Sequence, residues 1–116
     1  MENKLNVRHY NCIDKINVIQ NYIEKAWENF ILCEFNEGMK YFEKIMIELD
    51  GVITYISNIN NGSKSDVKIE NMLRILQKLE KSITNKDYVY SADLLKYEII
   101  PILDTWKNKL GVKFNN

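Results

Sequence analysis

Apolar residues recur every three or four positions over most of the chain, which is the spacing of one face of an α-helix. The alternation typical of strands is absent from the sequence, and only four glycines and one proline are present to interrupt helices. Short runs of polar, turn-forming residues separate the periodic stretches. The pattern predicts four helices, over about Asn11–Leu32, Phe35–Ile59, Asp66–Ile83 and Tyr88–Leu110.

The predicted boundaries rest on capping and turn residues. Asn11 and Ser65 are suitable N-caps for the first and third helices. The run at 60–64 holds only turn formers and no apolar residue, and 84–87 is a second short polar turn. Gly111 is a natural stop for the last helix, which leaves residues 111–116 as a tail. These short connections predict antiparallel neighbours.

The two halves of the chain superpose at an offset of 53 residues, as in Phe42 and Leu95. Met46 then matches Ile99, and the register is predicted to continue through both helical hairpins without a gap. Any two amphipathic hairpins can be slid into register, so we expect these four side chains all to be buried if the repeat is real. The sequence therefore predicts an all-α, antiparallel four-helix bundle made of two similar helical hairpins. In this arrangement the second helix buries Met39, Phe42, Met46, Leu49, Ile53 and Ile56.

Composition and charge narrow the function classes. The 116 residues fit one domain spanning 1–116, and an apolar content of 46% is that of a globular protein. The first ten residues are polar, so we expect a loosely ordered N-terminal segment and a cytoplasmic protein. Lys plus Arg equals Asp plus Glu at 16 each, and Arg8 and Arg74 are the only arginines. This balance argues against binding to nucleic acid or to a membrane.

Residues capable of chemistry are few and scattered. His9 is the only histidine and precedes the first predicted helix. Cys12 and Cys33 lie near opposite ends of one helix, roughly 30 Å apart, which is too far for a disulfide and indicates two reduced thiols. One histidine and two separated cysteines cannot supply a zinc site, and no glycine-rich phosphate loop is present. We therefore expect no enzymatic activity, no catalytic residues, no cofactor and no metal.

A second stripe on the last predicted helix is the one candidate site. Tyr90, Leu94, Tyr97 and Pro101 are spaced four, three and four residues apart, away from the face that contains Leu95. Either this helix is flanked on two sides within the bundle, or the stripe is a contact surface for a protein partner or a second copy. Pro101 removes a backbone hydrogen bond and should distort the helix there.

The segment Asp87–Trp106 resembles the C-terminal helix of small uncharacterised helical proteins from Firmicutes. In those proteins a leucine-x-tyrosine-glutamate-x-x-proline run, here Leu95 to Pro101, leads to a tryptophan. The stretch Phe35–Met39 is similar to the start of their second helix. The resemblance implies a bacterial cytosolic helical domain of unknown function and carries over no catalytic residue. A looser likeness to flagellar export chaperones rests on size and architecture alone.

Two function classes follow from these observations. The leading hypothesis is a non-enzymatic protein–protein interaction module, such as an adaptor, a chaperone-like protein or a small regulator, with a protein partner or a homodimer. The alternative is a helical bundle that binds a small molecule or metal, or an enzyme accessory subunit. That alternative requires polar groups that point into the core, whereas the predicted inward positions are almost purely apolar.

Overall fold

The computed structural model describes the backbone of residues 3–62 and 67–115, and the side chains of 7–59 and 67–111. Within those ranges every regular element is helical, which confirms an all-α bundle of four helices. The last helix is divided into two α-helical segments and a π-helical turn, η1. The elements are α1 (Asn3–Ile31), α2 (Phe35–Gly62), α3 (Glu70–Thr84), α4 (Tyr88–Asp93), η1 (Leu94–Ile99) and α5 (Ile100–Asn115).

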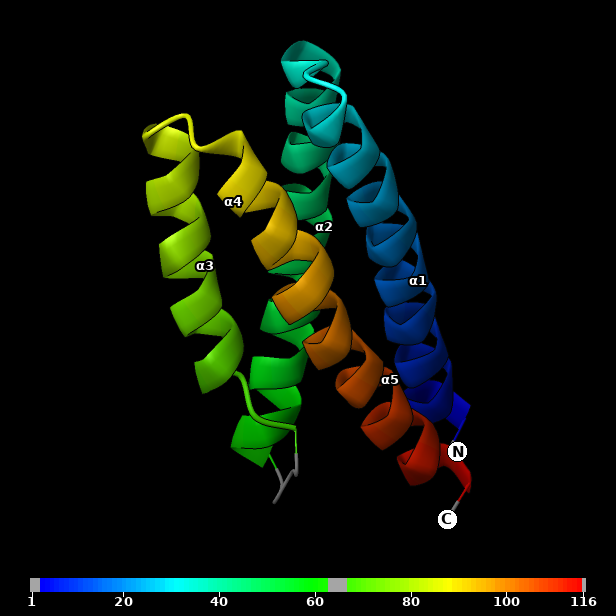
Figure 1. Cartoon of the computed structure of the whole chain (residues 1–116). Coiled ribbons are helices and arrows are strands. Elements are labelled where there is room, and N and C mark those ends of the chain that lie inside the picture. Colours follow the sequence, from blue (N-terminus) through cyan, green and yellow to red (C-terminus); the bar gives the residue numbers. More distant parts are fainter. Residues whose placement is uncertain (1–2, 63–66, 116) are drawn as a thin grey trace.

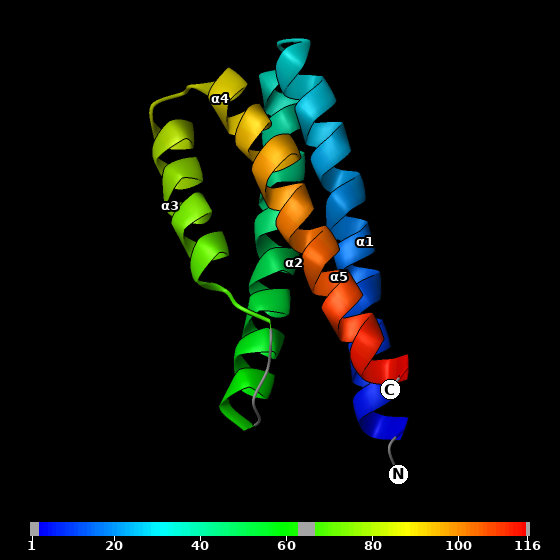
Figure 2. The same cartoon turned by 60° about the horizontal axis from the view of Figure 1, so that its bottom comes forward.

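Each helix reverses the direction of the one before it, and α4, η1 and α5 form one continuous rod (Figure 1). The long helix α1 packs along α2 on one side and along this rod on the other. Helix α3 packs chiefly against α4 and η1, so α1 and α3 lie on opposite sides of the molecule (Figure 2). Helix α2 packs closely on α1 and on no other helix to that extent, and the side of the bundle between α2 and α3 is partly open.

The core follows the predicted apolar spacing in α1 and departs from it in α2. In α1 the half-buried Trp27 is joined at helical spacing by the buried residues Cys12, Ile16, Ile19, Ile23, Ala26 and Phe30. In α2, Leu49 and Ile56 are buried as predicted, but Ile45 and Val52 complete the buried face. The buried face of α2 is therefore rotated toward α1 from the stripe that the sequence indicated. The largest buried side chains are Trp106, Phe30, Ile16, Ile19, Ile23, Ile45, Leu49, Ile56, Met72, Leu79, Leu94 and Leu95.

Helix α1 begins at Asn3, inside the N-terminal segment 1–10 that was expected to be loosely ordered. His9 is buried, and its Nδ1 shares a hydrogen bond with the hydroxyl of Tyr55 on α2. His9, Cys12 and Ile16 are spaced three and four residues apart, so the buried face of α1 extends past the predicted start at Asn11.

Two other boundaries differ from the prediction. Helix α2 runs on to Gly62, three residues beyond the predicted end, while α3 begins at Glu70 rather than near residue 66. The predicted cap Ser65 lies outside the described residues. Gly111 does not stop the last helix, which continues to Asn115. A single glycine in a helix costs only about 1 kcal/mol relative to alanine, so a following turn can override it.

The turn between α1 and α2 is a Schellman motif, a helix end closed by a residue in the left-handed conformation. Cys33 takes that conformation, with φ of 62°. Its N–H donates to the carbonyl of Phe30 at 3.1 Å, and the N–H of Glu34 donates to the carbonyl of Asn29 at 2.8 Å. These two bonds satisfy carbonyl groups that the end of α1 would otherwise leave unpaired.

The turn between α3 and α4 repeats this motif 53 residues later. Lys86 has φ of 59° and corresponds to Cys33. The N–H of Lys86 donates to Ile83 at 3.0 Å, and that of Asp87 donates to Ser82 at 2.9 Å. The predicted offset is therefore correct for both turns, down to the individual hydrogen bonds.

The offset changes to 54 residues after the π-helical turn. A π-helical turn holds one residue more than an α-helical turn, so it absorbs a one-residue insertion. The prediction that Phe42, Leu95, Met46 and Ile99 are all buried was wrong, because Phe42 and Met46 are only half-buried. By the criterion given with that prediction, the continuous 53-residue register of the two cores was an artefact of sliding two helical patterns, and the 53-residue offset holds at the turns. The pairs buried at the new offset are Ile45 and Ile99, Leu49 and Leu103, Val52 and Trp106, and Ile56 and Leu110.

Candidate functional site

An apolar groove lies on the open side of the bundle, between α2 and α3. Its volume is about 400 Å³. Apolar side chains from both helices line it, and Glu80 and Thr84 of α3 add polar groups to the lining. The apolar lining residues are Phe42 and Met46 of α2, and Leu76, Leu79 and Ile83 of α3.

The groove exists because the flanks of the two helices face each other without interlocking. Phe42 and Met46 lie one turn apart on α2, and Leu76 and Ile83 lie two turns apart on α3. All four are half-buried, whereas Leu79 is buried against the core. Helix α3 packs on α4 and η1, so its other flank does not come close enough to α2 to cover these side chains.

The apolar strip extends beyond the groove along both helices. On α2 the half-buried Met39 and Ile53 continue the row of Phe42 and Met46 in both directions. Just before α3 the half-buried Ile69 continues the row, and Leu73 of α3 is 43% exposed. A run of partly exposed apolar residues on two adjacent helices is typical of a surface that another protein covers.

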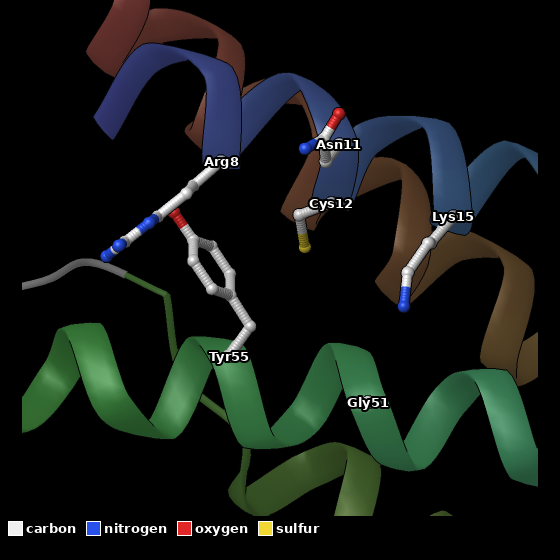
Figure 3. Close-up of a pocket in the computed structure, with 6 residues that line it drawn as sticks. All are labelled: Arg8, Asn11, Cys12, Lys15, Gly51 and Tyr55. Carbon is white, nitrogen blue, oxygen red and sulfur yellow. The ribbon is translucent and has the colours of Figure 1, made fainter. Parts of the chain in front are cut away.

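A second, smaller hollow of about 170 Å³ lies between α1 and α2 (Figure 3). The side chains of Cys12 and Lys15 project from α1 toward α2, and Arg8 lies beside the ring of Tyr55 (Figure 3). Gly51 presents no side chain from α2, which keeps the hollow open. The full lining is Arg8, Asn11, Cys12, Lys15, Gly51 and Tyr55.

The hollow holds no activated nucleophile. Burial raises the pKa of the Cys12 thiol to about 11, against a smaller opposing effect of Lys15, so the thiol is protonated near neutral pH. Burial also raises the pKa of Tyr55, whose hydroxyl is bonded to His9. The two cations, Arg8 and Lys15, give the hollow a positive edge that suits a small anion.

The structure separates the four residues of the predicted partner surface. Tyr90, Tyr97 and Pro101 are exposed, but Leu94 is fully buried, so the four do not form one surface. The helix is flanked on two sides within the bundle, by α1 and by α3, as the alternative interpretation held. The π-helical turn also packs Leu94 and Leu95 into the core together.

The sequence interpretation missed the groove itself, although it singled out Phe42 and Met46 for another reason. It assigned both residues to a closed core. The usable signal was the width of the apolar stripe on the second helix, which is too broad for contact with a single neighbour.

Across the described parts of the chain, no three His, Cys, Asp or Glu side chains come together as a metal site would require. None of the helices there is both long enough and apolar enough to cross a membrane.

Comparison with known proteins places these features in a family. Residues 10–109 match the family described as "Domain of unknown function (DUF8042)". The chain belongs to this family. The match runs from Tyr10 in α1 to Lys109 in α5, so the DUF8042 region includes both turns, the π-helical turn and the groove. The family match supports the expected resemblance to a domain of unknown function. It does not confirm the expected origin in Firmicutes.

A curated relative comes from a yeast. The chain is 34% identical over 85 residues to autophagy-related protein 17 of Vanderwaltozyma polyspora. That alignment covers 67% of the chain and 21% of the relative, so the chain spans about a fifth of the relative's length. No solved structure matches the chain.

Proposed function

We propose that the protein is a non-enzymatic interaction module that binds an apolar helical segment of a protein partner in the groove between α2 and α3. The observation that carries this proposal is the half-exposed apolar lining of that groove, contributed by two adjacent helices. Burying apolar surface stabilises a complex by about 25 cal/mol per Å² before the costs of association. A helix laid along both rows would bury the surface that the bundle leaves uncovered.

Two further observations support a binding role without catalysis. The Cys12 thiol, which lines the hollow between α1 and α2, has a raised pKa and is protonated near neutral pH. His9 is buried and shares a hydrogen bond with Tyr55. The equal numbers of acidic and basic residues support a protein partner over nucleic acid. These features are those of an adaptor or a small regulator.

The test compares two neighbouring substitutions on α2. Met46→Glu places a carboxylate in the groove, whereas Ile47→Glu places one at a site that is 71% exposed and does not line the groove. The probe is a synthetic amphipathic helix with leucines on one face and glutamines on the other, added to isotope-labelled protein and followed by NMR. We expect the wild type and the Ile47→Glu variant to bind, with shifts centred on Leu76 and Ile83.

Met46→Glu should keep its helical circular dichroism and lose binding, because a charge in an apolar groove opposes the docked face. If the folded Met46→Glu variant binds the peptide as well as the wild type does, the groove is not the binding site. Sedimentation equilibrium of the same variants tests the case in which the partner is a second copy of the chain.

A second candidate function is the binding of a small anion in the hollow between α1 and α2. The supporting observation is the pair of cations, Arg8 and Lys15, on its edge. Inorganic phosphate should raise the melting temperature of the wild type and of a Lys25→Gln control, and Lys15→Gln should weaken the effect. An equal rise in all three proteins would exclude specific binding in the hollow.

A further inference from the structure

We infer that the segment bound by the groove is a basic amphipathic helix, with Lys or Arg on both sides of its apolar stripe. This inference rests on the proposed function and adds the charge of the partner. Its basis is the way that charged residues are distributed around α2 and α3.

Acidic residues border the groove on both helices. Glu43 lies four residues after Met39 and three before Met46, so it adjoins the apolar row of α2. Asp50 lies four residues after Met46 and three before Ile53, in the same position about two turns further along. Both carboxylates are exposed, and on the facing helix Glu80 lines the groove directly.

The basic residues of α2 lie on its other flank. Lys40 is paired with Glu37 at 2.9 Å. The Nζ atom of Lys44 lies over the rings of Tyr22 and Tyr41, at 5.6 and 5.4 Å, which directs it toward α1. Neither lysine borders the groove, so the α2 edge of the groove is negative.

The basic residues of α3 also avoid the groove. Lys78 and Lys81 line a different hollow, with Asp87 and Tyr90, on the α4 side of the helix. Arg74 is hydrogen-bonded to Asn71 and is exposed on the solvent side. The described residues therefore give the groove an apolar floor with carboxylates on both edges.

The length of the groove and the carboxylates on its edges indicate which kind of helix fits it. The row on α2 runs from Met39 to Ile53, about 21 Å at 1.5 Å per residue, which is the length of roughly four turns of a helix. Lysine and arginine on either side of such a helix can lay their aliphatic stems along the apolar floor and place their charges beside the carboxylates. The same groove of a second copy would instead bring carboxylates against carboxylates, so a different protein is the better partner.

The experiment uses two peptides with the same leucine face. One carries lysines beside that face and the other carries glutamates, and binding to the full chain is measured by fluorescence anisotropy. We expect the lysine peptide to bind the wild type at least about tenfold more tightly, with a difference that shrinks as salt is raised.

A charge-reversal set identifies the residues responsible. The triple variant Glu43→Lys, Asp50→Lys and Glu80→Lys should prefer the glutamate peptide. A control triple variant, Asp14→Lys, Glu28→Lys and Glu98→Lys, makes the same change in net charge at exposed sites that do not line the groove. This control should retain the preference of the wild type.

The outcomes separate the two proposals. If the wild type binds both peptides equally, the inferred charge of the partner is wrong and the groove remains a binding site. If both triple variants lose the preference alike, the effect is one of net charge and the inference is likewise wrong. If neither peptide binds the wild type, the proposed function fails together with the inference.

Discussion

Cys12 and Cys33 show how position gives two residues of one type different properties. Both are free thiols, as their separation along the chain predicted. Cys12 faces the hollow between α1 and α2 and is buried, whereas Cys33 is exposed at the end of the turn. Cys33 also takes the left-handed conformation that glycine usually supplies at this position of the Schellman motif.

This difference predicts selective alkylation. With a pKa of about 11, Cys12 is about one part in a thousand thiolate at pH 8, and the thiolate is the reactive form. Iodoacetamide at pH 8 should therefore modify Cys33 first, and the rate at Cys12 should rise about tenfold per pH unit up to pH 10. Peptide mapping by mass spectrometry measures both rates. Equal rates in the folded protein would contradict the buried placement of Cys12, and denatured protein provides the reference in which both react.

Gly38 and Gly51 form a second contrast at this scale. A Cβ atom at Gly38 would meet two ring atoms of Phe30 at 2.5 Å, and that ring is buried. A Cβ atom at Gly51 would meet only the flexible end of Lys15, at 3.8 Å. Gly38 is required because α2 approaches α1 closely at this position. At Gly51 there is room for a larger residue.

We therefore predict opposite effects of alanine at the two sites. Gly38→Ala should destabilise the protein by about 1–3 kcal/mol through overpacking, less any gain in helix propensity. Gly51→Ala should stabilise it by about 0.5–1 kcal/mol, because alanine restricts the unfolded chain and favours the helix. Urea unfolding followed by circular dichroism measures both. A Gly38→Ala variant as stable as the wild type would contradict the close packing against Phe30.

Among the elements, the fourth helix departs most from a regular α-helix. Its π-helical turn spans Leu94–Ile99 and ends two residues before Pro101. The N–H of Ile100 donates to the carbonyl of Leu95, five residues back. Since Pro101 has no N–H to donate, the backbone bonding at this point is already weaker than in a regular helix. The turn and the proline together mark where the offset between the halves changes.

The π-helical turn predicts an unusual tolerance of deletion. Removing the exposed Tyr97 should convert the turn to α-helix and leave the residues after it in register with the core. Removing the exposed Ile47 from the regular helix α2 should rotate everything after it by about 100° and unfold the protein. Thermal unfolding measures the difference, with the melting temperature of the Tyr97 deletion within several degrees of the wild type. Loss of folding on deletion of Tyr97 would show that the turn is indispensable.

The four helices and their turns could be predicted from sequence because both depend on local patterns. Apolar spacing placed α1 and α2, and the correspondence of Cys33 with Lys86 followed from the repeat. The π-helical turn could not be predicted, since no residue type from Leu94 to Ile99 requires it and it serves the packing of neighbouring helices. The groove was missed for a similar reason. Phe42 and Met46 are half-buried because α3 packs on α4 and η1 instead of on α2, and the local sequence pattern does not determine how helices pack together.

At the scale of the whole molecule, the helices are unequally supported. Helix α1 is in contact with α2 and with all three segments of the last helix. Helix α3 packs on α4 and η1 and leaves its other flank exposed at Leu73 and along the groove. Packing on one side only should make α3 the helix that opens most easily.

Hydrogen exchange measured by mass spectrometry tests whether α3 opens more easily than α1. Amides of α3 between Leu73 and Leu79 should exchange well before those of α1 between Ile16 and Ile23, because local opening of α3 exposes less buried surface. Addition of the lysine peptide should slow exchange in α3 and leave α1 unchanged. Equal protection of the two helices in the free protein would show that the open side of the bundle contributes no local instability.

The attachments of α3 have a mechanical consequence. The Schellman turn at Lys86 joins one end to α4, and near the other end the indole N–H of Trp106 on α5 donates to the carbonyl of Lys68 at 3.2 Å. Both attachments lead to the same rod, and neither leads to α2. We therefore expect α3 to move together with the rod rather than with α2, so that any shift of the rod relative to α2 would change the width of the groove.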